Sequence, residues 1–363
     1  MDPSAQPHAQ PPQPPVTPQV VHPPVYAPPR RRGFRGFWIF LTVLLFLGLA
    51  GSILLNVVLL VGGGPRSAVK PVRERYFFPE KFQTGTDKVA VMHLEGTIYE
   101  DGSLFDFAKR QIERVRADKA VKAVVLRINS PGGTVTGSDY LYHRLKELRE
   151  EKKIPIVVSM GSLAASGGYY VSMAVGDRPD SIFAEPMTWT GSIGVIVPLF
   201  NVSQLLNRWG IEDNAIASGP LKEMGSFAKP MSEQERQVWN ALVHESFQRF
   251  KSVIKEGRPR FQKDPAALDR LATGQVYTAE QAKQNGLIDE IGFTEKAIDR
   301  AIALAGVDRN NVQVVEYEQE PSLADLFLGT SQAQSRGADV QSLVERLAAF
   351  RAYYLPPRML PVK

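Results

Sequence analysis

A serine within a run of small residues is the first candidate for chemistry in this chain. Residues 159–170 read SMGSLAASGGYY, and Ser166 stands near the middle of this run. The run has two interpretations: a tight strand-to-helix connection whose small side chains let backbones pack closely, or a turn that presents Ser166 as a nucleophile. The GxSxG pattern of a hydrolase elbow is missing, because residue 164 is Ala. The residues around Ser166 therefore leave both interpretations open.

A serine nucleophile needs a base, and the histidines offer none in a distinctive loop. Each is better explained as a tail, surface or strand-edge residue; the five are His8, His22, His93, His143 and His244. Lysine also activates serine when burial among apolar groups keeps its amine neutral. Lys222, in the Gly-, Pro- and Ser-marked loop IASGPLKEM, is the candidate, although most lysines are solvated surface groups.

Acyl transfer also needs backbone N–H groups that face the developing negative charge. The segment INSPGG (128–133) follows a predicted strand, and Gly132 and Gly133 allow backbone angles that turn N–H groups toward a pocket. In an open α/β sheet, ligands bind in the crevice beyond the carboxyl ends of the strands. Both glycine-rich segments leave a strand at that edge, so we expect them to converge.

Other kinds of site find little support. The chain has no cysteine, which excludes thiolate metal sites and disulfides, and no HExxH or other metal-ligand spacing occurs. The segment GGTVTGSD lacks the lysine of a phosphate-binding loop, and the net charge of +5 is spread along the chain apart from one cluster. We therefore predict no metal, no cofactor and no nucleic-acid partner.

The order of elements predicts an α/β fold. Short β-branched runs, typical of strands buried on both faces, alternate with helical spacing, which indicates βαβ units and a parallel sheet. The predicted strands are 88–94, 121–128, 155–160, 181–184 and 193–197, and the helices between the first three are Leu104–Arg116 and Ser138–Glu150. Later helices are predicted to begin at the caps Ser232, Thr278 and Thr294.

The N-terminal part has the pattern of a membrane anchor behind a cytoplasmic tail. Residues 1–36 are rich in proline, end in a basic cluster and are expected to be disordered. Phe37–Val61 holds 25 residues without a charge, enough to cross a bilayer, and the positive-inside rule places the N-terminus in the cytoplasm. A cleaved signal peptide would have a shorter apolar run, so an uncleaved anchor is favoured, and residues 62–86 then form a linker.

Four motifs, RINSPGG, MGSLAASGGYYVS, TGSIGV and SGxxK, occur in order within residues 87–307. In order and spacing they resemble the signal peptide peptidase A family of membrane-anchored Ser-Lys proteases. The resemblance implies these roles: nucleophile Ser166, general base Lys222, lysine-orienting Ser192, and oxyanion donors Gly132 or Gly133 together with Gly167. Glu223 departs from the family, where aspartate usually follows the lysine, and this puts a local hydrogen bond in doubt.

The resemblance also implies a Clp-protease/crotonase-like sheet in a protease domain over residues 87–320. It implies a single-pass cell-membrane protein whose extracytoplasmic domain cleaves remnant signal peptides, and a homo-oligomeric ring in which neighbouring protomers complete the site. A crotonase-like acyl-CoA enzyme is one alternative, disfavoured because such enzymes are soluble and use carboxylates. A catalytically inactive scaffold is the other, although it would be expected to lose Ser166 or Lys222.

The C-terminal segment, residues 321–363, carries apolar side chains at helical spacing before Pro356 and Pro357. Apolar surface of this kind at a chain end is expected to be covered. Its own domain, a neighbouring protomer and the membrane face are the three candidates. We favour the neighbouring protomer, since the resemblance implies a ring.

Overall fold

The computed structural model describes residues 35–62, 72–78, 80–319 and 353–354. The chain divides between Ser67 and Ala68 into two units. The described part of the first unit is one helix, α1 (Arg35–Gly62). Its Gly36–Leu54 portion is 19 residues long and apolar enough to cross a membrane. At about 1.5 Å per residue this portion measures about 28 Å, close to the ~30 Å hydrocarbon core of a bilayer.

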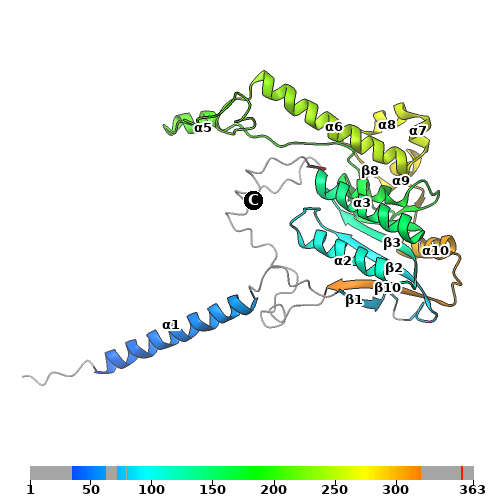
Figure 1. Ribbon diagram of the computed structural model, residues 1–363, viewed down its shortest axis with the longest axis horizontal. Helices are drawn as coiled ribbons and strands as arrows, with labels where there is room; N and C mark the ends of the chain where they lie inside the picture. The colour runs from blue at the N-terminus through cyan, green and yellow to red at the C-terminus, as the bar shows by residue number, and fades with distance from the viewer. Residues whose placement is uncertain (1–34, 63–71, 79, 320–352, 355–363) are drawn as a thin grey trace, which may run out of the picture. The chain divides into compact units, whose positions relative to one another are not determined.

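The second unit is built on a mostly parallel sheet (Figure 1). Its main strand order is β1-β10-β2-β3-β5-β6-β9, with β7 added to β5 and β8 added to β7. Only β1 on β10 and β8 on β7 run antiparallel among these pairs. The strands are β1 (Val72–Tyr76), β2 (Asp87–Glu95), β3 (Val121–Ser130), β5 (Ile156–Ala165), β6 (Ile182–Ala184), β7 (Trp189–Gly191), β8 (Val276–Thr278), β9 (Glu290–Ile291) and β10 (Val312–Gln319). A separate pair joins β4 (Gly133–Thr134) to β11 (Tyr353–Tyr354). The predicted α/β fold is confirmed.

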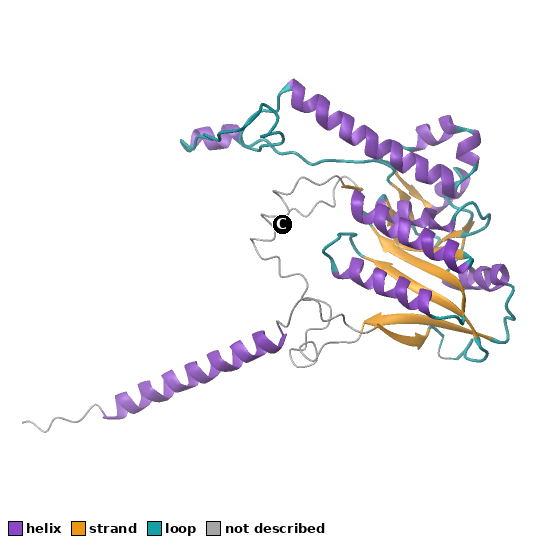
Figure 2. Cartoon of the chain, in the orientation of Figure 1, coloured by secondary structure: helices purple, strands orange, loops and turns teal. Residues whose placement is uncertain are grey.

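Helices cover both faces of the sheet (Figure 2). The larger apolar core holds buried side chains of the strands and of α2, α3, α4 and α6, for example Leu141 and Phe250. The smaller core lies between the strands and α10, for example at Val125 and Ile298. The helices are α2 (Ser103–Ala117), α3 (Val135–Lys152), α4 (Gly167–Ser172), η1 (Met173–Val175), α5 (Ser203–Arg208), α6 (Glu233–Gly257), α7 (Arg260–Lys263), α8 (Pro265–Leu271), α9 (Ala279–Gln284) and α10 (Thr294–Ala305). Both faces of β2, β3 and β5 are therefore buried over most of their length, as the β-branched runs predict.

Three details differ from the sequence prediction. The stretch 62–86, predicted as a linker, contains β1, an edge strand paired antiparallel with β10. Its sequence VRERY has three charged residues in a row, so it lacks the apolar run by which buried strands are found. Residues 193–197, predicted as a strand, do not form one; the strand in this region is β7, at Trp189–Gly191.

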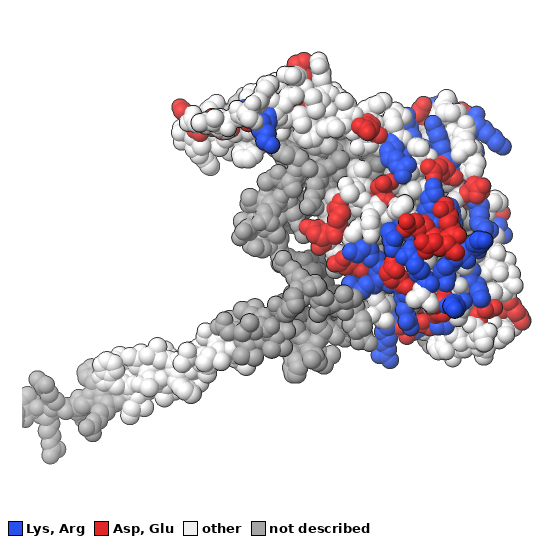
Figure 3. Space-filling view, viewed as in Figure 1, with Lys and Arg blue, Asp and Glu red and all other residues white. Residues whose placement is uncertain are grey.

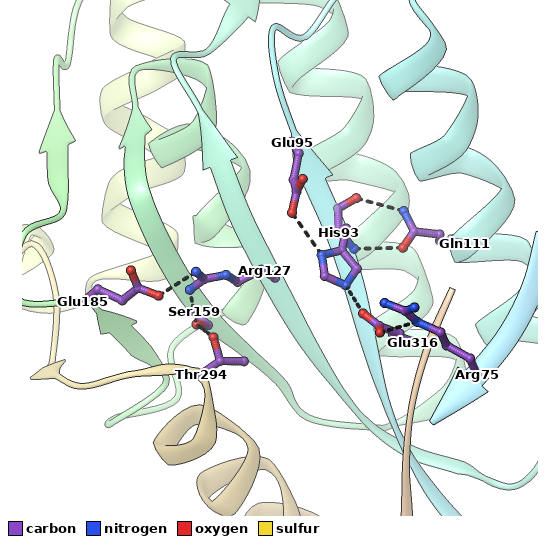
Figure 4. Close-up of polar contacts among 9 residues, drawn as sticks. All are labelled: Arg75, His93, Glu95, Gln111, Arg127, Ser159, Glu185, Thr294 and Glu316. Carbon is purple, nitrogen blue, oxygen red and sulfur yellow. Dashed lines mark hydrogen bonds and ion pairs between the residues drawn. The ribbon is translucent and has the colours of Figure 1, made fainter. Parts of the chain in front are cut away.

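The third difference concerns the start of α10. The residue in the cap position is Phe293, so Thr294 is the first helical residue and does not cap the helix. Its hydroxyl instead lies 3.0 Å from the hydroxyl of Ser159, which accepts a hydrogen bond from Arg127 (Figure 4). The tertiary contact from β5 thus takes the oxygen that a local cap would use. By contrast, the capping boxes predicted at Ser232 and Thr278 are both present.

A partly buried polar cluster ties the edge strand β1 to the sheet (Figure 4). The Nε2 atom of His93 lies 2.8 Å from Glu316, and its Nδ1 atom lies 3.2 Å from Glu95. Arg75 of β1 donates to the same Glu316 over 2.6 Å. The side chain of Gln111 completes the arrangement by bonding both the backbone N–H and the C=O of His93. His93 is therefore one member of an ion-pair chain that crosses β1, β10 and β2.

This cluster predicts how the free energy of unfolding changes with pH. Burial alone lowers the pKa of His93, but hydrogen bonds and charge from Glu316 and Glu95 outweigh it and raise the pKa to about 9. The stabilisation is therefore complete below about pH 6.5, the pKa of a free histidine, and is lost as pH rises through about 9. We expect the free energy of unfolding to fall by about 2–3 kcal/mol across this window, measured by denaturation at both ends.

His143 supplies the matched control, because its ion pair with Glu147 is exposed. His93→Gln should flatten the dependence on pH, and His143→Gln should leave it as in the unaltered protein. An equal slope in the unaltered protein and in His93→Gln would contradict the assignment.

Candidate active site

Ser166 occupies a strained turn between β5 and α4. Its φ of 53° and ψ of −114° are unusual for a residue other than glycine. The backbone is held on both sides, since Ser166 N–H donates to Gly191 O over 2.7 Å and Tyr170 N–H donates to Ser166 O over 2.8 Å. The side chain is fully buried, and among the described residues its Oγ has no hydrogen-bond partner. An unpaired buried hydroxyl on a strained backbone is costly and is typical of a functional site.

The two glycine-rich loops converge as the topology predicts. A Cβ atom on Gly167 would lie 3.1 Å from the Gly133 nitrogen and 2.3 Å from Ser138 Oγ, so only glycine fits this close approach. Gly133 is equally confined, because a Cβ there would lie 1.9 Å from Ile98 O. Ile98 fixes the loop through its backbone: its N–H donates to Gly132 O and its C=O accepts from Thr134 N–H, each over 2.9 Å.

The N–H groups of this region are not equivalent. Gly132 has a φ of 97°, and its N–H already donates to Ser130 Oγ over 3.1 Å. Gly167 is the first residue of α4, where helical N–H groups have no partner within the helix. Of the two adjacent glycines, Gly132 thus has its N–H engaged by a side chain, which favours Gly133 over Gly132 as the predicted oxyanion donor beside Gly167. Nothing in the sequence around Ser130 signals its role in engaging Gly132.

Ser192 lies beside the nucleophile turn. It follows β7, which pairs with β5 up to Ala165, and its N–H donates to Gln275 O over 2.7 Å. Like Ser166 it is buried and has a positive φ, 51°. A cavity of about 420 Å³ opens next to it, lined by Ser192–Ile196, by Asn240, Val243, His244 and Phe247 of α6, and by Ala272–Gly274. Its lining is mainly apolar, and His244, predicted as an ordinary surface histidine, is part of it.

Lys222 is not brought to Ser166 within one chain. It lies in the segment 197–231, here called the arm, which includes α5 and runs out beyond the N-terminal end of α6 (Figure 1). Lys222 is exposed, and it is not a hydrogen-bond partner of Ser166 Oγ. The projecting end of the molecule shows few charged side chains (Figure 3). Instead the arm exposes large apolar side chains: Phe200, Leu205, Trp209, Ile211, Ile216 and Phe227.

An ion-pair bridge braces the loop that carries Lys222. Lys229 lies 3.0 Å from Glu223, the neighbour of Lys222, and 3.2 Å from Glu235 in the first turn of α6. Glu235 also accepts from the backbone N–H of Ser232 in the capping box. This hydrogen bond and the ammonium group of Lys229 hold the pKa of Glu235 below its usual range. Glu223 thus has a structural partner of its own.

Comparisons with known proteins identify the family of the chain. The model of "Peptidase family S49" matches residues 148–308. A protein of Enterococcus faecium named "Putative signal peptide peptidase SppA" is 36% identical over 262 residues, 69% of this chain and 73% of its own length. The chain belongs to peptidase family S49, the signal peptide peptidase A family.

Two further relatives of the family are longer than this chain. "Protease 4" of Salmonella typhi is 33% identical over 67% of this chain and 38% of its own length. "Serine protease SPPA, chloroplastic" of Arabidopsis thaliana is 32% identical over 68% of this chain and 37% of its own length. The chain is thus a serine peptidase of family S49, as the four motifs predict. These relatives are named as proteases, which argues against the acyl-CoA enzyme alternative.

Proposed function

We propose that the chain is a serine endopeptidase in which Ser166 is the nucleophile and Lys222 is the general base. The observation that carries the proposal is the buried, unpartnered hydroxyl of Ser166, held on a strained turn against the Gly132–Gly133 loop. The S49 membership supports a serine mechanism, and the described residues offer no histidine partner to Ser166 Oγ.

The reaction would proceed by acyl transfer. The neutral amine of Lys222 takes the proton from Ser166 Oγ as that oxygen attacks the peptide carbonyl carbon. The N–H groups of Gly133 and Gly167 stabilise the oxyanion, and the lysine ammonium then protonates the leaving amine. Water hydrolyses the acyl-enzyme with Lys222 again as base. Ser192, buried beside the nucleophile turn, would hold the lysine amine in place.

The lysine would come from a second copy of the chain. Lys222 is exposed on a projecting arm, whereas Ser166 is buried and its Oγ has no hydrogen-bond partner among the residues that the structure describes. The exposed apolar side chains of the arm favour burial against another protein surface. A head-to-tail contact repeated around a closed ring would then complete every site. The proposed assembly is therefore a homo-oligomer in which each arm serves a neighbour.

The substrate would be an extended, largely apolar peptide. β11 pairs antiparallel with β4, so this edge beside the oxyanion glycines accepts an added strand. The mainly apolar cavity at Ser192 offers room for a side chain of such a peptide. The name of the E. faecium relative suggests signal peptides. We propose that α1 anchors the chain with its N-terminus in the cytoplasm, which would keep the site close to peptides left in the membrane.

β11 is the part of the C-terminal segment 321–363 that the structure describes. Tyr353 and Tyr354 pair with β4 of their own chain, while the other residues of 321–363 lie outside the described residues. A contact of that segment with a neighbouring protomer stays a prediction. The tail 1–34, with the arginines at 30–32, also lies outside the described residues.

An acylating reagent tests the nucleophile directly. A serine-directed fluorophosphonate should label the full-length protein in detergent at Ser166, located by mass spectrometry of its peptides. Ser162 is the internal control, because it lies four residues away in the same segment and is exposed. Labelling at Ser162 with Ser166 unmodified, in a protein that cleaves peptides, would contradict the proposal.

A further inference from the structure

One carboxylate joins the three helices that carry the proposed catalytic parts. Asp139 Oδ1 accepts a hydrogen bond from the hydroxyl of Tyr170 and two from Arg249, whose Nε and Nη2 atoms lie at 3.3 and 3.1 Å. Asp139 belongs to α3, Tyr170 to α4 and Arg249 to α6. The same oxygen therefore touches both other helices.

Each helix continues from a different part of the site. α3 follows directly on the loop of oxyanion glycines, since its N-cap is Thr134 of β4. α4 starts immediately after Ser166, and the N–H of Tyr170 bonds Ser166 O, so this tyrosine lies one turn from the nucleophile. α6 follows the arm that bears Lys222. Asp139 therefore connects the oxyanion loop, the nucleophile and the base-bearing arm.

Apolar packing holds only one end of α6. Phe250, Val253 and Ile254 are fully buried, and a Cβ atom on Gly257 would lie 3.0 Å from Met173 Cα. The first three turns of α6 are largely exposed. Arg249 stands at the boundary between these two halves of α6.

The far end of α6 is linked to the lysine loop. Lys229 joins Glu235 of α6 to Glu223 beside Lys222, as described above. Polar contacts therefore hold α6 at two places. Tyr170, Asp139 and Arg249 link it to α4, and Glu235, Lys229 and Glu223 link it to the arm. The helix between them acts as the rigid connection.

We propose that Asp139 is a positioning residue that sets the direction of α6 against the rest of its own chain, and with it the placement of the arm and of Lys222 at the Ser166 of the neighbouring copy. This inference rests on the proposed Ser166–Lys222 mechanism. Asp139 and Arg249 are both about half exposed, and exposed ion pairs contribute little to stability. Their effect is accordingly expected on catalysis and not on folding.

The test uses Asp139→Asn and Arg249→Met in the full-length protein in detergent. We expect kcat to fall about 10- to 100-fold with KM little changed, because a misplacement of about 1 Å can cost about 10²-fold. The acid limb of the pH–rate profile should also change, because it reports the state of the base at the site. The melting temperature should stay the same.

Lys251→Met is the matched control. Lys251 lies two residues from Arg249 on α6 and forms an ion pair with Asp269 over 2.8 Å. Asp269 belongs to α8 and not to α4. It should leave kcat and the pH–rate profile unchanged. Arg249→Lys, which keeps a charged donor, should recover part of the activity. The double variant Asp139→Asn/Arg249→Met should lose no more than the worse single variant, because both act through one contact.

Three results would overturn the inference. They are an unchanged kcat and pH–rate profile in Asp139→Asn and Arg249→Met, an effect on melting temperature alone, and an equal loss in Lys251→Met. Failure of the proposed function is distinguishable: there, Ser166→Ala would retain activity. An inactive Ser166→Ala beside a fully active Asp139→Asn would reject only the role of Asp139.

Discussion

Replacing Ser166 by alanine is expected to lower kcat/KM for peptide hydrolysis by at least about 10³-fold, since nucleophile and base act as one unit. The variant should fold normally. Alanine adopts the same backbone angles as serine, and the lost hydroxyl has no hydrogen-bond partner among the described residues. The measurement is the steady-state rate on a fluorogenic apolar peptide, together with a melting curve to verify folding.

Ser162→Ala is the control for this experiment. It lies in the same glycine- and alanine-rich segment, but its side chain is exposed. It should retain the activity of the unaltered protein. Appreciable turnover by well-folded Ser166→Ala would exclude this serine as the nucleophile and would reopen the interpretation of the segment as a packing turn.

The fold was largely predictable because its strands are buried on both faces. β-branched runs such as VKAVVLRI in β3 are typical of strands buried on both faces. In a parallel sheet, the loops that follow such strands lie at one edge of the sheet. The convergence of Gly133 and Gly167 follows from that topology alone. The edge strand β1 is not predictable in this way. It pairs with β10 on one side only and its other side is open to solvent, so its side chains can be charged.

The positions of side chains from distant segments could not be predicted. Asp139 and Arg249 are 110 residues apart, and they meet because α3 and α6 both pack against α4 and η1. Thr294 has the sequence of a helix cap, yet its hydroxyl contacts Ser159 of β5. For Lys222, the motif predicts the role of general base, whereas the structure leaves this residue exposed on the arm and not bonded to Ser166 Oγ. Contacts of this kind cannot be predicted from the residues that neighbour each of these side chains in the sequence.

Lys222→Ala and Lys222→Arg are both expected to lower kcat/KM by at least about 10³-fold. Arginine keeps the charge but stays protonated, so it cannot accept a proton from serine. Because a lysine base must be neutral, activity of the unaltered protein should rise with pH and be low in acid. Lys229→Ala is the control: Lys229 braces the same arm, but through Glu223 and Glu235, so its loss should be smaller. An active Lys222→Arg would show that the charge, not the base, is what Lys222 supplies.

Coexpression of two inactive chains then decides where the lysine comes from. If Lys222 acts on the Ser166 of a neighbour, an assembly of Ser166→Ala and Lys222→Ala chains contains sites with both groups intact. Random mixing across a head-to-tail interface would restore about a quarter of the sites. If the lysine acted within its own chain, every site would lack one of the two groups and the mixture would stay inactive. The exposed position of Lys222 on the arm and the unpaired hydroxyl of Ser166 favour recovery.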